Sequence, residues 1–84
     1  MQMSESFIGV DASKAELVVA VHGQPGCQRI ANNPGAVLAW LRLLPAHARL
    51  AVESTGRCHQ LLAALAAGMG LTVFVLNARD VYFY

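Results

Sequence analysis

Residues 71–76 constrain the fold more than any other part of the sequence. They form an apolar run of strand length that follows Gly70 and contains no charged residue. A strand without polar alternation is typical of a parallel sheet that is covered on both faces, because neither side of such a strand meets water. Parallel strands are joined by long crossovers, which are usually helices. The run therefore predicts an α/β fold.

The first part of the chain predicts three antiparallel strands. Residues 7–11 and 17–21 are short apolar runs, and the polar stretch between them suits a hairpin. Residues 24–26 contain proline and glycine, which favour a turn, and residues 27–31 follow as a plausible third strand. The chain therefore opens with a predicted meander.

The remainder predicts two helices that alternate with two strands. Asn33 can cap a helix, Pro34 suits its first position, and Pro45 cannot continue it. Residues 50–53 are the next apolar run, and Gly56 breaks the chain after it. Helical spacing of apolar residues marks the two helices: Val37, Leu38, Leu41 and Leu44 in the first, and Leu61, Leu62, Leu65, Ala66 and Met69 in the second. With residues 71–76 last, the predicted order is βββαβαβ, in one domain over residues 1–84.

Composition excludes several classes of protein. The chain is 56% hydrophobic and 13% charged, which excludes disorder and leaves a core with little polar cover. We therefore expect a partner, a second copy or further chain to cover it. The net charge of +1 is too small to predict nucleic-acid binding by itself.

Localisation follows from what the sequence lacks. No apolar run approaches the roughly 20 residues of a membrane span, and the first residues lack the order of a signal peptide. We expect a cytoplasmic protein without a membrane partner. Cys27 and Cys58 belong to no metal-ligand spacing and are expected to be reduced thiols.

Asp11 and Glu53 are the candidate site residues, because each ends an apolar strand and precedes small or polar residues. If those strands are parallel neighbours, the carboxylates meet at the carboxyl edge of the sheet, where α/β sheets bind ligands. At about 5 Å they would repel by roughly 3 kcal/mol at an effective dielectric near ~20. A hard divalent cation removes this repulsion and can organise phosphodiester displacement. A structural interpretation stays open, in which Asp11 orders the next turn and Glu53 caps the next helix.

Five short segments of the sequence, taken together in their order and spacing, resemble those of a known protein family. They are residues 7–14, the Val-rich strand that follows, the helix start at 33–35, residues 52–56 and residues 75–79. Together they resemble the DEDD transposases of bacterial insertion sequences that are related to the Piv DNA invertase. The resemblance spans nearly the whole chain.

The resemblance implies an RNase H/RuvC-like fold with a mixed central sheet and a nuclease site of four acids that bind Mg²⁺. Asp11 and Glu53 match the first Asp and the Glu of that tetrad, so both are expected to be catalytic and metal-binding. The other two acids and a serine nucleophile domain are expected beyond Tyr84. We therefore expect an N-terminal part of the domain, incomplete at its C-terminus and inactive alone. The parent protein would carry out DNA transposition, with DNA and a guide RNA of the element as partners.

Other residues carry weaker expectations. Asp80 follows the last predicted strand and is not expected to be a third ligand, and Cys58 stands where the family usually has an aromatic residue. Lys14 and Arg57 flank the acids and could meet phosphates, although single basic residues are more often solvated. His59 is expected to face solvent. Further, Trp40 is expected to pack in the core or an interface, and the aromatic residues 82–84 favour truncation or an association surface.

Two alternative functions remain open. An actin-like ATPase or sugar kinase opens with a similar strand and hairpin, but it needs a glycine just after the acid so that backbone amides can approach phosphate. This chain has Ala12 there. The other alternative is a non-catalytic remnant that associates with itself as a homo-oligomer.

Overall fold

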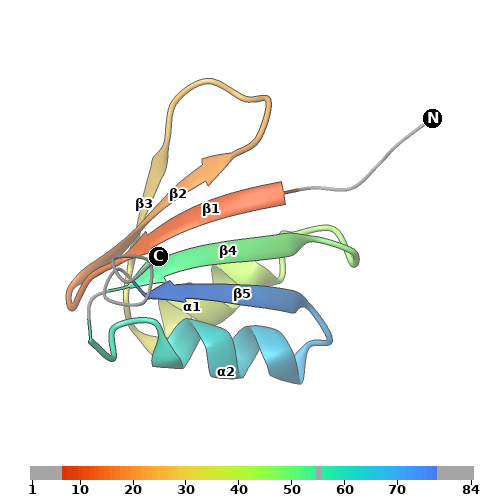
Figure 1. The fold of residues 1–84 in the computed structure, drawn as a ribbon. Helices are drawn as coiled ribbons and strands as arrows, with labels where there is room; N and C mark the ends of the chain where they lie inside the picture. Colours follow the sequence, from red (N-terminus) through yellow and green to blue (C-terminus); the bar gives the residue numbers. More distant parts are fainter. Residues whose placement is uncertain (1–6, 55, 78–84) are drawn as a thin grey trace.

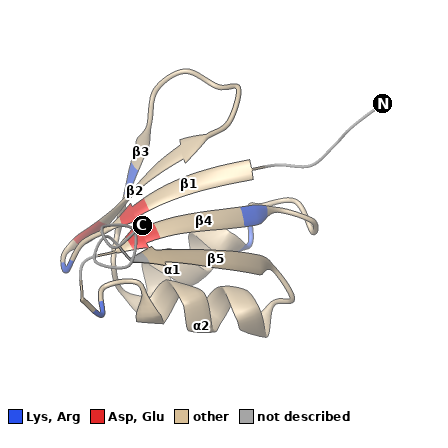
Figure 2. Cartoon of the chain, in the orientation of Figure 1, with Lys and Arg blue, Asp and Glu red and all other residues tan. Residues whose placement is uncertain are grey.

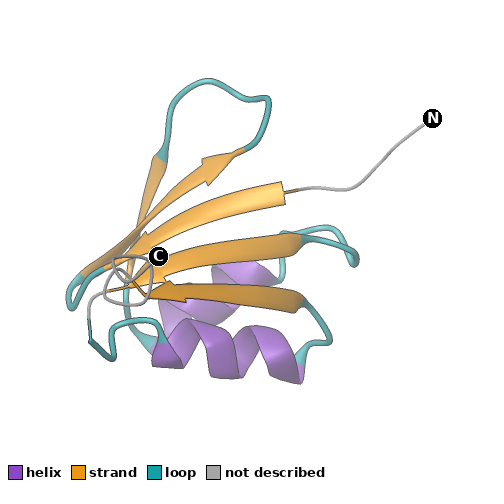
Figure 3. Cartoon of the chain, in the orientation of Figure 1, coloured by secondary structure: helices purple, strands orange, loops and turns teal. Residues whose placement is uncertain are grey.

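The computed structural model describes residues 7–54 and 56–77 of the chain. They form an α/β fold, in which two helices pack on a mixed sheet of five strands (Figures 1 and 3). The elements follow one another in the order predicted from the sequence. Their bounds are β1 Phe7–Ala12, β2 Glu16–Val21, β3 Gln28–Ala31, α1 Pro34–Leu41, β4 Arg49–Ser54, α2 Gln60–Gly68 and β5 Thr72–Asn77.

The strands lie in the spatial order β3-β2-β1-β4-β5. β1 pairs antiparallel with β2, and β2 pairs antiparallel with β3, so the predicted meander is confirmed. β4 pairs in parallel with both β1 and β5. α1 leads from β3 to β4 and α2 leads from β4 to β5, since parallel strands require a crossover. β1 and β4 are therefore parallel neighbours within the sheet.

Alternate strand residues point toward the helices and form the core. Ile8 and Val10 of β1 are buried, as are Leu50 and Val52 of β4. The helices add Val37, Trp40, Leu41, Leu62 and Ala66. Trp40 is 6% exposed, which places it in the core, one of the two positions predicted for it. Burial of each large aliphatic side chain stabilises the fold by about 1.5–3 kcal/mol.

The face of the sheet turned away from both helices is here called the open face. Its residues are Phe7, Gly9, Asp11, Glu16, Val18, Ala20, Arg29, Ala31, Arg49, Ala51, Glu53, Thr72, Phe74 and Leu76. No helix or strand of the described chain covers it (Figure 1). The described residues therefore cover β5 on one face only, and the cover expected from outside for its other face stays a prediction. β5 is an edge strand, and Phe74 and Leu76 are 48% and 47% exposed.

Both helices are shorter than their sequence patterns. α1 begins as predicted, because Asn33 accepts a hydrogen bond from the amide of Ala36 at 2.9 Å, but it ends at Leu41. Leu44 still packs against the core from the following turn. α2 begins at Gln60, several residues after Gly56, and Met69 lies beyond its end. No helix within the described residues is long and apolar enough to cross a membrane.

Candidate acidic site at the carboxyl edge of the sheet

Asp11 and Glu53 face each other across the parallel pair of β1 and β4. They are direct partners in the register, each one residue before the end of its strand. Neighbouring strands lie about 4.8 Å apart. Figure 2 shows the two acidic segments side by side. Both side chains are exposed and belong to the open face. The structure thus brings together the two residues that the sequence singled out.

The acids share a shallow hollow of about 400 Å³, here called the acidic hollow. Its other lining residues are mostly small or apolar: Gly9, Val10, Val18, Ala20, Ala51 and Leu76. A Cβ atom added at Gly9 would meet only the Ala20 carbonyl oxygen, at 3.9 Å. Packing therefore does not require a glycine there. Because Gly9 has no side chain, the hollow is deeper at this position.

Asp11 could have ordered the turn after β1 and Glu53 could have capped α2, but other residues take both roles. Both the amide and the hydroxyl of Ser13 donate to the carbonyl oxygen of Glu16, each at 2.9 Å, and so order the turn after β1. α2 begins at Gln60, with His59 at its N-cap position. Neither the turn nor the helix start depends on Asp11 or Glu53. Their placement on the open face is thus left without a structural explanation.

The chain matches no family model and no curated protein. The opposed placement of Asp11 and Glu53 is therefore supported by the fold of this chain and not by a comparison with relatives.

Two carboxylates suit Mg²⁺, which proteins hold through one or two carboxylates while waters and substrate phosphates complete the shell. Asp11 and Glu53 are exposed oxygen donors on adjacent strands, so the donor set fits that ion. No cluster of three or more His, Cys, Asp or Glu side chains capable of holding a metal occurs in the described residues. Asp80 and residues 82–84 lie outside the described residues.

A second hollow, here called the basic hollow, opens at the same edge of the sheet. It measures about 310 Å³ and is lined by Lys14, Asn32, Arg57, Cys58 and Leu61. The Asn32 amide nitrogen donates to the carbonyl oxygens of Ser13 at 2.8 Å and Cys58 at 3.0 Å. Asn32 therefore joins the turn after β1 to the turn before α2.

Sequence reasoning missed this role of Asn32. The neighbouring Asn33 explains the helix cap. The only hint of a further role in the sequence was that Asn32, next to it, has no part in that cap. Its two acceptors are distant in sequence, and their approach could not be inferred from local pattern.

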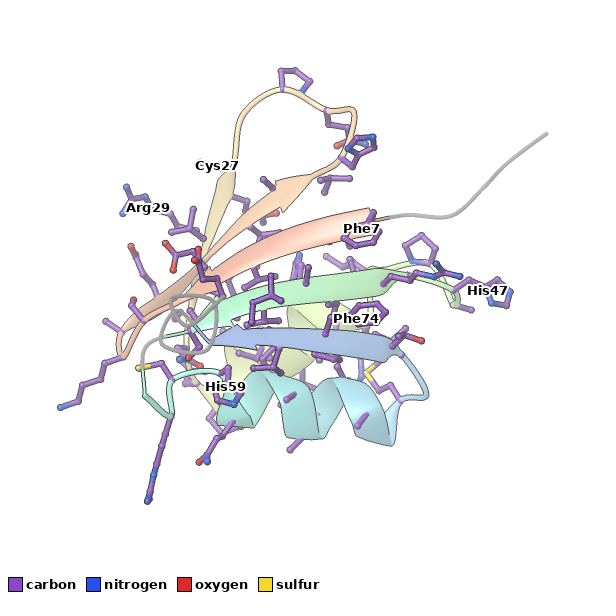
Figure 4. The ribbon with its side chains drawn as sticks, viewed as in Figure 1. Phe7, Cys27, Arg29, His47, His59 and Phe74 are labelled. Carbon is purple, nitrogen blue, oxygen red and sulfur yellow. The ribbon has the colours of Figure 1, made fainter. Side chains whose placement is uncertain are left out.

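The histidines and cysteines add no further ligand cluster in the described chain. Figure 4 shows His59 at the start of α2, whereas His47 lies near the opposite edge of the sheet. The expectation that His59 faces solvent is wrong, because it is half-buried and its Nδ1 is buried without a hydrogen-bond partner. Cys27 is an exposed free thiol, and Cys58 is a half-buried one.

Proposed function

We propose that this chain is part of an RNase H/RuvC-like nuclease domain of a DEDD transposase, which cuts and joins DNA phosphodiester bonds during transposition. The observation that carries the proposal is the register of β1 and β4, which sets Asp11 directly opposite Glu53 at the carboxyl edge. The βββαβαβ order and the mixed sheet support it. By the resemblance, the partners would be DNA and a guide RNA, in the cytoplasm.

The roles of the two acids follow from their position. Asp11 and Glu53 would bind Mg²⁺ from strands whose pairing limits how far the carboxylates can move apart. A metal ion bound there would supply electrostatic stabilisation to a phosphodiester undergoing displacement. The open face leaves the acidic hollow accessible, so a nucleic-acid strand can approach it.

The turn after Asp11 favours this function over an ATPase with a phosphate-binding hairpin. Such a hairpin must offer free backbone amides to phosphate. Here the Ser13 amide already donates to the Glu16 carbonyl oxygen, and Ala12 is buried in the core. The Ser13 amide is therefore not free to bind a phosphate.

Mn²⁺ provides a direct test, because it replaces Mg²⁺ and broadens the NMR signals of nearby nuclei. We expect Mn²⁺ to broaden the amide signals around Asp11 and Glu53 first. Asp11→Asn and Glu53→Gln should each weaken binding by about tenfold or more, because each removes half of the site's negative charge. Glu16→Gln is the matched control, since Arg29 already neutralises Glu16 at 2.7 Å. Uniform broadening, or equal loss in all three variants, would falsify the proposed site.

A further inference from the structure

We infer that the basic hollow binds one backbone phosphate of a nucleic-acid strand and so holds the strand beside Asp11 and Glu53. The inference rests on the proposed function and adds a substrate contact to it. It is carried by three independent features of the hollow: its charge, the helix start that adjoins it, and the hydrogen bonds that shape it.

The charge comes from Lys14 and Arg57, which line the hollow from two different turns. Arg29 is neutralised by Glu16, whereas Lys14 and Arg57 have no acidic partner in the described chain. Two unneutralised cations at one hollow attract an anion. An arginine in particular can donate two parallel hydrogen bonds to a phosphate.

The start of α2 adds to this attraction. α2 is a nine-residue helix whose N-cap residue, His59, makes no side-chain cap hydrogen bond, and no acidic residue lies in its first turn. Leu61 of that first turn lines the hollow. The N-terminus of a helix carries partial positive charge and unpaired amide groups, both of which favour phosphate. The Gln60 amide already donates to the Arg57 carbonyl oxygen at 3.1 Å, and within the described residues no acidic side chain of the first turn caps the amides that follow.

Asn32 holds the two cationic turns in place. It donates to the carbonyl oxygen of Ser13, which precedes Lys14, and to that of Cys58, which follows Arg57. Its Oδ1 is buried without a hydrogen-bond partner. The hollow is consequently shaped before any ligand arrives, which lowers the entropic cost of binding.

The position of the hollow links it to the acids. Ser13 directly follows β1, and the turn with Arg57 follows β4, so both turns lie at the carboxyl edge, near which Asp11 and Glu53 stand. The acids lie on the open face, whereas Cys58 and Leu61 of the basic hollow pack against the core on the helix side, so a strand that contacts both hollows would pass around this end of the sheet. A phosphodiester chain can contact both hollows, whereas a free phosphate contacts only one.

The test measures binding of a short, fluorescently labelled single-stranded oligonucleotide to the full chain by anisotropy at several salt concentrations. The double variant Lys14→Gln/Arg57→Gln should bind about tenfold or more weakly. Its salt dependence should fall by about 0.7 in the log–log slope, the value for one lost phosphate contact on a single strand. The control Arg42→Gln removes an exposed arginine at the C-cap of α1, at the opposite edge of the sheet, and should change neither quantity.

NMR mapping identifies the ligand. The oligonucleotide should shift the amides of Lys14, Arg57, Cys58 and Leu61 in the wild type and not in the double variant. Equal loss of affinity in Arg42→Gln, or shifts confined to other residues, would overturn the inference. Shifts of these amides by inorganic phosphate, without oligonucleotide binding, would overturn the nucleic-acid assignment.

The same samples separate this inference from the proposed function. The double variant keeps Asp11 and Glu53, so its Mn²⁺ broadening should equal that of the wild type. Failure of the phosphate site would leave that broadening intact. Failure of the proposed function would appear as no specific Mn²⁺ broadening in the wild type itself.

Discussion

At the scale of single residues, Asn32 and Asn33 are neighbours of identical type with different partners. Asn33 accepts a hydrogen bond from Ala36, within its own helix start. Asn32 donates to Ser13 and to Cys58, which belong to two turns far from it in the sequence. The first interaction is local and the second is tertiary.

Asn32→Ala should destabilise the protein by about 1–3 kcal/mol, because it leaves two carbonyl oxygens without their donor. Hydrogen exchange should rise selectively in the turns at Ser13 and Cys58. Chemical denaturation and exchange measured by NMR would check both effects. An unchanged exchange rate in either turn would contradict the role assigned to Asn32.

This difference also explains what sequence could predict at this scale. The cap at Asn33 was predictable because Pro34 and the helical pattern stand beside it. The candidate acids were predictable as strand ends, yet their direct opposition depends on the register of Asp11 with Glu53, which no local pattern encodes. The exposure of His59 was predicted wrongly, because the packing around the start of α2 is tertiary.

At the scale of elements, α1 depends on its cap more than a longer helix would. It has only eight residues, begins with Pro34 and carries no acid in its first turn or base in its last turn. Helices of this length are marginal without capping and packing. The Asn33 side chain is consequently a main local contribution to its start.

Asn33→Ala should therefore lower the free energy of unfolding by about 1 kcal/mol, the usual effect of removing a cap. Exchange should rise in the first turn of α1 and remain unchanged in the turn at Cys58. Asn33→Asp serves as the control, since Asp also caps helices well and should retain most of the stability. An equal loss in both variants would show that the cap is not the cause.

Element types were predictable because their periodicities differ, but their ends and surroundings were not. The apolar spacing continues through Leu44 and Met69 although α1 and α2 end before them. An apolar residue can pack from a turn as well as from a helix. Likewise, the pattern of β5 resembles that of an interior strand, and only the strand order reveals it as an edge.

At the scale of the whole molecule, β5 is an uncharged edge strand that presents Phe74 and Leu76 on the open face. β5 has no charged or proline residue that would discourage edge pairing, whereas the opposite edge strand β3 is short and carries Arg29. Phe7 and Phe74 remain 44% and 48% exposed. Such a surface favours association with a second copy of the chain.

We predict that the chain self-associates with rising concentration and that Phe74→Lys shifts it toward the monomer, because a lysine opposes both edge pairing and apolar contact. Leu43→Lys is the control, since Leu43 is 79% exposed in the turn after α1 and lies away from this surface. Sedimentation over a wide concentration range would check the prediction. A wild type that remains monomeric throughout would contradict it.

The pairing of β1 with β4 also fixes how the site can change over time. Strand side chains alternate between faces, so a slip of one residue in β4 would turn Glu53 into the core and Val52 onto the open face. The apolar residues that prevent this slip are the same ones that hold Glu53 opposite Asp11. Selection for a stable core alone would therefore keep these two positions facing each other. A descendant that lost either acid would retain the backbone geometry, and one or two substitutions could restore the pair.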